Sequence, residues 1–164
     1  MSLLIAILED NLDRRAAMED RLQDRFPQFE RRYFANAASM VEFLETNLDK
    51  LALIALDHDL ELIETGNGQV RDPDTGRDVA DFLAEREPFC PIVIHTSNSP
   101  AAIGMQTVLQ EAGWQVSRVL PFDDLAWIDA DWFPTVRSAL VNWATPLTVT
   151  SAAQRSQPLK LNVS

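Results

Sequence analysis

Short apolar runs alternate with amphipathic segments along most of this chain, and this alternation limits the fold more than any other feature. The runs have the length of buried β-strands and lie at residues 3–8, 51–56, 91–94 and 116–120, with a weaker strand signal at residues 31–34. Apolar residues recur at roughly helical spacing in the segments between and after them, at residues 11–26, 39–48, 79–85, from 99 onward and 129–143. Elements in this order are typical of a parallel sheet covered on both faces, so the sequence predicts an α/β domain with five strands and five helices.

Capping residues and aromatic residues refine the expected helices. Ser39 is expected to cap the second helix, and Ser99 with Pro100 to open the fourth. Large aromatic side chains gather in and before the last helix, where we expect them in the core: Trp127, Trp132, Phe133 and Trp143.

Two segments lack a periodic pattern. Residues 61–77 are rich in glycine and proline, so a long loop is expected after the third strand. Residues 145–164 are rich in serine, threonine, glutamine and proline with isolated aliphatic residues, which predicts a flexible tail or an extended segment on the surface. The domain is therefore placed at residues 1–144.

Charge and cysteine content limit the partners. The net charge of −11 argues against binding nucleic acid in bulk, but a small phosphate compound remains compatible if a metal or a helix end supplies positive potential. The single cysteine, Cys90, cannot form an internal disulfide, which favours a reducing cytoplasm. No stretch approaches the roughly 18 apolar residues of a membrane span, and the acidic Glu9 and Asp10 after the first run argue against a signal peptide.

Polar residues follow three of the predicted strands. In an open parallel sheet, ligands bind beyond the carboxyl ends of the strands, so these residues are the candidates for a site. They are Glu9 and Asp10 after the first strand, Asp57, His58 and Asp59 after the third, and His95, Thr96, Ser97 and Asn98 after the fourth. The chain has two histidines, and both are in this set.

This pattern resembles the receiver domains of two-component signalling over residues 3–143. The resemblance rests on the acidic pair Glu9 and Asp10, on Asp57 at a strand end, on Thr96, and on the segments Ala112-Gly113 and Pro121-Phe122. It implies a flavodoxin-like sheet of order 2-1-3-4-5, with a divalent metal held by the acidic pair and Asp57. Receivers place a lysine where this chain has Leu120, and their link after the third strand is shorter, so ordinary phosphorelay signalling is not expected here.

A resemblance to a smaller family is compatible with both Leu120 and the longer link after the third strand. The segments Leu56-Asp57-His58-Asp59-Leu60, Asp74-Thr75-Gly76 and His95-Thr96-Ser97-Asn98, together with Gly104 and Met105, are similar to the cyclic-phosphate processing receiver domains. This resemblance implies a small or cyclic phosphate compound as the substrate class.

The residues themselves suggest how such a compound could be opened. Two imidazoles can share the acid and base tasks, so His58 and His95 are the candidate catalytic pair, with Asp59 or Asp57 orienting one of them. The phosphate could lie against Thr96, Ser97, Asn98 and Arg77 near the start of the fourth helix. Glu9, Asp10 and Asp57 would repel it unless they hold a cation, for which magnesium or manganese is favoured, and zinc or iron fits if the histidines also bind.

The alternative is a receiver-like module without catalysis. Such a module would regulate a protein partner, or pair with a second copy of itself, through its last strand and helix. The missing lysine favours this alternative, whereas the two histidines at strand ends favour an enzyme. In a module without catalysis, both histidines would be structural residues that form hydrogen bonds with neighbouring backbone or carboxylate groups.

Overall fold

The computed structural model describes residues 2–61, 63–64, 66–71 and 74–144. Its main sheet has five strands in the order β2-β1-β3-β6-β7, all paired in parallel. Their bounds are β1 (Leu4–Leu8), β2 (Glu30–Phe34), β3 (Leu51–Leu56), β6 (Ile92–His95) and β7 (Val116–Val119). Counted in sequence within this sheet, the order is 2-1-3-4-5, which confirms the predicted topology.

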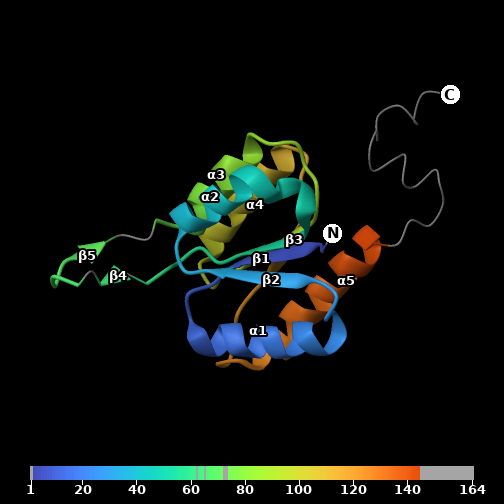
Figure 1. Cartoon of the computed structure of the whole chain (residues 1–164), viewed down its shortest axis with the longest axis horizontal. Helices are drawn as coiled ribbons and strands as arrows, with labels where there is room; N and C mark the ends of the chain where they lie inside the picture. The colour runs from blue at the N-terminus through green and yellow to red at the C-terminus, as the bar shows by residue number, and fades with distance from the viewer. Residues whose placement is uncertain (1, 62, 65, 72–73, 145–164) are drawn as a thin grey trace.

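Five helices cover the two faces of the sheet (Figure 1). One face carries α1 and α5, and the other carries α2, α3 and α4. Their bounds are α1 (Leu12–Arg25), α2 (Ala37–Asn47), α3 (Gly76–Ala84), α4 (Ser99–Glu111) and α5 (Phe133–Ala144). A single turn of 3-10 helix (Leu48–Lys50) precedes β3, and a π-helical turn (Ile128–Trp132) leads into α5. The described helices include none that is both long and apolar enough to cross a membrane.

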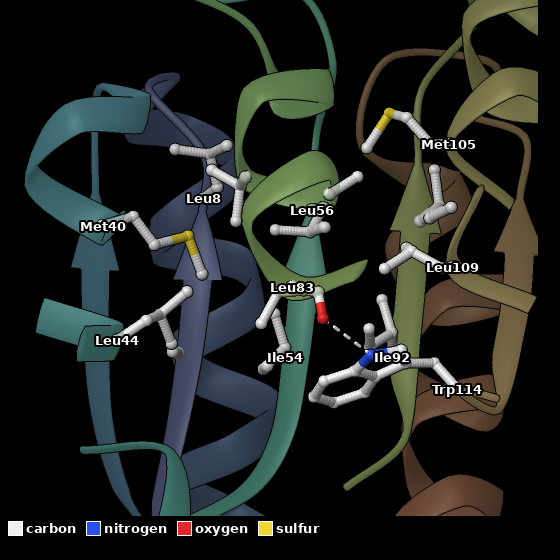
Figure 2. Packing of buried hydrophobic residues seen from close by; sticks show 14 of the residues in the cluster. Leu8, Met40, Leu44, Ile54, Leu56, Leu83, Ile92, Met105, Leu109 and Trp114 are labelled. Carbon is white, nitrogen blue, oxygen red and sulfur yellow. Dashed lines mark hydrogen bonds between the residues drawn. The ribbon is translucent and has the colours of Figure 1, made fainter. Parts of the chain in front are cut away.

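The strands alternate their side chains between two apolar cores. All six residues of β3 are buried, which explains why its sequence is apolar throughout. On the face under α2, α3 and α4, Ile54 and Leu56 pack with side chains from these helices, and the indole N–H of Trp114 donates to the Leu83 carbonyl at 3.0 Å (Figure 2). The other face is filled by the predicted aromatic group: Trp127 and Trp132 are fully buried there, and Phe133 and Trp143 are partly buried against them.

The caps of α2 and α4 differ from the prediction by one or more residues. The Asn36 side chain caps α2 by accepting from the N–H of Ser39, so Ser39 lies inside the first turn. Likewise, Asn98 caps α4 by accepting from the Ala101 N–H at 3.1 Å, and Ser99 is the first helical residue. Serine and asparagine cap helices equally well, so the sequence alone does not choose between neighbouring candidates.

The segment predicted as a loop contains structure of its own. Two short strands, β4 (Ile63–Glu64) and β5 (Val70–Arg71), form an antiparallel pair that projects beyond the main sheet (Figure 1). Helix α3 also begins earlier than its apolar pattern indicates, because Thr75 and Asp78 form a capping box. The predicted tail, 145–164, lies outside the described residues.

The start of α3 lies directly against the end of β3. The N–H of Gly76 donates to the His58 carbonyl at 3.1 Å, and a Cβ at Gly76 would lie only 1.9 Å from the backbone oxygen of Asp57. Only glycine permits this approach, which fixes the backbone that carries Asp57 and His58.

Replacing this glycine should therefore destabilise the domain. We expect Gly76→Ala to lower the free energy of unfolding by about 2–3 kcal/mol, because the backbone must shift to relieve the contact. Gly66→Ala is the matched control, since its Cβ would meet no atom within 4 Å, and it should change stability by less than about 0.5 kcal/mol. Urea unfolding measures both, and equal stability of the two variants would contradict the close approach.

Candidate active site

Three buried polar side chains meet at the carboxyl ends of the central strands. Glu9 follows β1, Asp57 follows β3, and His95 is the last residue of β6; their exposed fractions are 0%, 4% and 0%. One ligand atom from each lies within 4.8 Å of the other two, and no other group of this kind occurs among the residues that the structure describes. We call Glu9, Asp57 and His95 the buried trio.

Backbone pairing of the sheet fixes the positions of the trio. The N–H of Glu9 donates to the Phe34 carbonyl at 2.9 Å, and the N–H of Asp57 donates to the Leu8 carbonyl at 3.1 Å. His95 pairs with Val119 of the neighbouring strand. Each side chain therefore projects from a backbone held by the ladder, which is the kind of support that a precise ligand site requires.

Several polar atoms of the trio have no hydrogen-bond partner although they are buried. They are Oε1 of Glu9 and both ring nitrogens of His95. His95 Nε2 lies 3.4 Å from Glu9 Oε1 but not in hydrogen-bond geometry. Buried polar atoms nearly always have a partner, so these atoms fit a site that receives a ligand. Two carboxylates and an imidazole are a donor set suited to a divalent transition metal.

The ionisation of the two carboxylates is perturbed in opposite directions. Burial disfavours the charged form of Glu9, but His95, the Asn11 N–H and Arg14 together lower its pKa below the ordinary value. Burial raises the pKa of Asp57 to about 6, and the negative charge of Glu9 adds to this rise against the opposing effects of His95 and Arg14. The trio thus holds one readily ionised carboxylate and one that is costly to ionise.

Aromatic rings enclose His95. Its ring stacks on Trp127 with a centroid distance of 5.8 Å and meets Trp132 edge-on at 6.3 Å. The residue has no exposed surface, so its imidazole has no direct contact with the solvent. This environment suits a ligand or positioning residue better than a general acid or base.

His58 lies in a different environment from His95. Its Nδ1 is 2.9 Å from Oδ1 of Asp59, and its side chain is 17% exposed beside an Asp59 side chain that is 62% exposed. The backbone N–H of His58 donates to Asp57 Oδ1 at 2.7 Å. Both histidines are at the predicted edge of the sheet, but only His95 belongs to the buried trio.

Asp10 and the residues after β6 serve local structure. A side-chain oxygen of Asp10 accepts from the backbone N–H of Glu61 and so ties the segment after β3 to the end of β1. The hydroxyl of buried Thr96 accepts from the Asn98 N–H at 3.1 Å, and the Asn98 side chain is used in the cap of α4. Ser97 is exposed at this turn.

Arg77 pairs within its own helix. Its Nε donates to Asp81 at 2.7 Å, one turn along α3, and its Nη1 lies where a Cβ of Gly104 on α4 would approach to 3.0 Å. The guanidinium therefore packs between α3 and α4. Gly104, one of the residues that carried the resemblance, leaves room for it.

The structure adds a site residue that sequence reasoning missed. Arg14, in the first turn of α1, has its Nη1 3.5 Å from Glu9 Oε1 and 3.7 Å from Asp57 Oδ2. Its guanidinium lies over the Trp127 ring, 5.3 Å from the centroid. Helix α1 carries several arginines, and helical spacing alone does not say which one faces the strand ends. The sequence signal that could have identified Arg14 is its position one turn after Glu9 and Asp10.

The raised pKa of Asp57 predicts how stability depends on pH. The group has an ordinary pKa of 3.8 and a folded pKa of about 6, so in the metal-free protein its ionisation destabilises the fold increasingly between pH 4 and 6 and fully above pH 6. This shift corresponds to on the order of 3 kcal/mol. We expect Asp57→Asn to melt about 5 °C higher than the wild type at pH 7.5 with EDTA, and the difference to disappear near pH 4.

The exposed Asp59 offers a control at the same strand end. Asp59→Asn removes the same charge from a side chain that is 62% exposed, so it should not raise the melting temperature at pH 7.5. A lower melting temperature of Asp57→Asn at pH 7.5 would contradict the proposed cost of ionising Asp57.

Comparison with crystal structures places the fold among signal receivers. A signal receiver domain from Vibrio parahaemolyticus is 14% identical with a TM-score of 0.60, covering 88% of this chain and 94% of that one. A response regulator receiver domain from Rhodospirillum rubrum is 17% identical with a TM-score of 0.60, covering 88% and 96%. The phosphorylated cyanobacterial phytochrome response regulator RcpA is 16% identical with a TM-score of 0.57, again covering 88% and 96%. At these identities the likeness shows the fold alone.

Sequence comparison identifies the family within this fold. No curated protein matches the chain significantly. The family profile of the cyclic-phosphate processing receiver domain matches residues 6–111, a range that includes the whole buried trio as well as His58 and Arg14. The chain therefore belongs to the cyclic-phosphate processing receiver domain family.

Proposed function

We propose that this domain is a metal-dependent phosphoesterase that acts on a cyclic or otherwise small phosphate compound. The observation that carries the proposal is the buried trio, in which two carboxylates and an imidazole converge at the ligand-binding edge with polar atoms left without partners. Family membership supports the substrate class. The single cysteine, buried and free, fits an enzyme of the cytoplasm.

The cation in this proposal is held by Glu9, Asp57 and His95. The sequence-based set had Asp10 in place of His95, but a side-chain oxygen of Asp10 accepts a backbone N–H, whereas neither nitrogen of His95 makes a hydrogen bond. An imidazole among the ligands favours zinc or iron over magnesium, whereas the two carboxylates suit manganese as well as magnesium. When bound, such an ion supplies polarisation of a phosphoryl oxygen and activation of water.

Proton transfer falls to His58 in this proposal. Asp59 contacts Nδ1 of the ring, which orients the imidazole and leaves Nε2 free to accept or donate a proton at the partly exposed edge. His95 is enclosed by Trp127 and Trp132 and is assigned to the cation instead. A single histidine with its aspartate therefore replaces the two-histidine pair expected from the sequence.

The phosphate is proposed to lie beside the start of α4. In the first turn of this helix Pro100 has no N–H, and the N–H groups of Ala101 and Ala102 donate to Asn98, which leaves the N–H of Ser99 for a ligand. The exposed Ser97 and the Asn98 amide flank this turn, next to the buried Thr96. Arg77 pairs with Asp81 and would have to leave that partner to reach a ligand. We therefore assign Arg77 a minor part.

A second candidate function is a non-catalytic module that binds a protein partner. It is favoured by the exposed apolar residues that follow β7, where Leu120 is 58% and Phe122 is 45% exposed. Leu120 also occupies the position of the receiver lysine. A partner could cover this patch whether or not the trio is catalytic.

An assay of metal-dependent hydrolysis separates the two functions. We expect the wild type to hydrolyse at least one cyclic phosphodiester with manganese, and His58→Ala to lose about 100-fold or more of the rate while keeping its manganese affinity. His95→Ala should lose about tenfold or more in manganese affinity as well, because a ligand is removed. Calorimetric titration measures the affinity.

The module without catalysis predicts the opposite pattern. In that case no cyclic phosphodiester would be hydrolysed with magnesium, manganese, zinc or iron, although folded protein is present. Equal manganese affinity of His95→Ala and the wild type would remove His95 from the cation site.

A further inference from the structure

Arg14 places a cation beside both carboxylates of the trio. Its Nη1 is 3.5 Å from Glu9 Oε1 and 3.7 Å from Asp57 Oδ2. The side chain is 29% exposed, whereas those of Glu9 and Asp57 are 0% and 5% exposed. The guanidinium therefore lies at the boundary between the buried trio and the solvent, where an incoming ligand would first meet it.

The hydrogen-bonding capacity of this guanidinium is not used up by the carboxylates. Glu9 Oε1 accepts no hydrogen bond, and Asp57 Oδ2 is beyond hydrogen-bonding distance from Arg14. A guanidinium has five N–H donors in a fixed planar fork. Arg14 is thus attracted by the charges of two carboxylates, and its N–H groups remain available to donate to a further acceptor.

Trp127 holds the guanidinium in place. The guanidinium carbon lies 5.3 Å from the centroid of the indole ring, which is within the range of a cation–π contact. Trp127 is fully buried, and its indole N–H donates to the Asp124 carbonyl at 2.9 Å, so the ring itself is fixed. The backbone N–H of Arg14 is fixed as well, since it donates to the N-cap side chain of Asn11 at 2.9 Å.

We propose that Arg14 contacts the phosphate oxygens of the substrate from the side opposite to the groups at the start of α4, supplying from α1 the positive charge that Leu120 cannot supply from the end of β7. The proposal rests on the proposed function for the substrate class. Once the carboxylates of the trio bind a metal ion, their attraction for Arg14 weakens and its planar fork can pair with two phosphate oxygens. Arg14 is then a binding residue for the phosphate oxygens of the cyclic diester, which has one negative charge, and of the dianionic monoester that hydrolysis forms from it.

The alternative role for Arg14 is that of an internal counter-ion. In that role it would only offset the charges of Glu9 and Asp57 until a metal ion replaces it. Both roles predict that Arg14→Gln binds manganese more tightly than the wild type, because a competing cation is removed. Only the phosphate-binding role predicts that the variant loses affinity for an anion.

The test is calorimetric titration of inorganic sulfate into the manganese-loaded protein. Sulfate is a tetrahedral dianion that stays soluble with each of the metals considered. Arg14→Gln should weaken sulfate binding by about tenfold or more, and Arg14→Lys by less, since a lysine keeps the charge without the fork. Arg21→Gln is the matched control: it removes the same charge from the same helix, but Arg21 pairs with exposed Asp129, so sulfate affinity should not change.

The outcomes separate this inference from the proposed function. Sulfate affinity that is unchanged in Arg14→Gln, or lost equally in Arg21→Gln, overturns the role of Arg14, as does a manganese-loaded wild type that binds no sulfate. Hydrolysis of cyclic phosphodiesters is measured on the same samples. Sulfate binding that depends on Arg14, in a protein that hydrolyses none of them, refutes the phosphoesterase and leaves the anion site in place. Melting curves of each variant show that it is folded.

Discussion

The parallel pairing of β1, β3 and β6 is the constraint on which the rest of the structure depends. Because adjacent parallel strands end at the same edge, the residues that follow them must become neighbours, whatever their distance in the sequence. Glu9, Asp57 and His95 are brought together in this way. The apolar strands and the helices on both faces supply the stability that allows two carboxylates to be buried side by side.

The residues around the trio determine how its polar atoms are paired and ionised. Trp127 and Trp132 pack against the His95 ring, so both of its nitrogens and Glu9 Oε1, which have no hydrogen-bond partner, depend on one another, on Arg14 or on a bound ligand. Burial raises the pKa of Asp57 to about 6, and the low dielectric around the trio strengthens any charge interaction that forms there. A divalent cation would turn this unfavourable arrangement into a favourable one. Gly76 fixes the position of Asp57, because it lets the start of α3 lie directly against the Asp57 backbone.

Much of the fold could be predicted from the sequence, because it depends on periodicity. The apolar runs gave the five strands in their order, and the polar residues after them gave the edge where the trio lies. Details that depend on neighbouring side chains could not be predicted. Asn36 and Asn98 cap helices for which serines were equally good candidates, and short strands formed in a segment without a pattern. Similarly, the difference between His58 and His95, and the approach of Arg14, are set by rings and helix orientation that only the packed structure defines.

We propose that His95 binds a metal ion together with Glu9 and Asp57. Pulsed electron paramagnetic resonance of the manganese-loaded protein tests it most directly, because a nitrogen bound to the ion modulates the electron spin echo. The account predicts a coupling to one imidazole nitrogen that persists in His58→Gln and disappears in His95→Gln. A spectrum of the wild type with oxygen ligands alone, or a nitrogen coupling that is lost in His58→Gln instead, would contradict it.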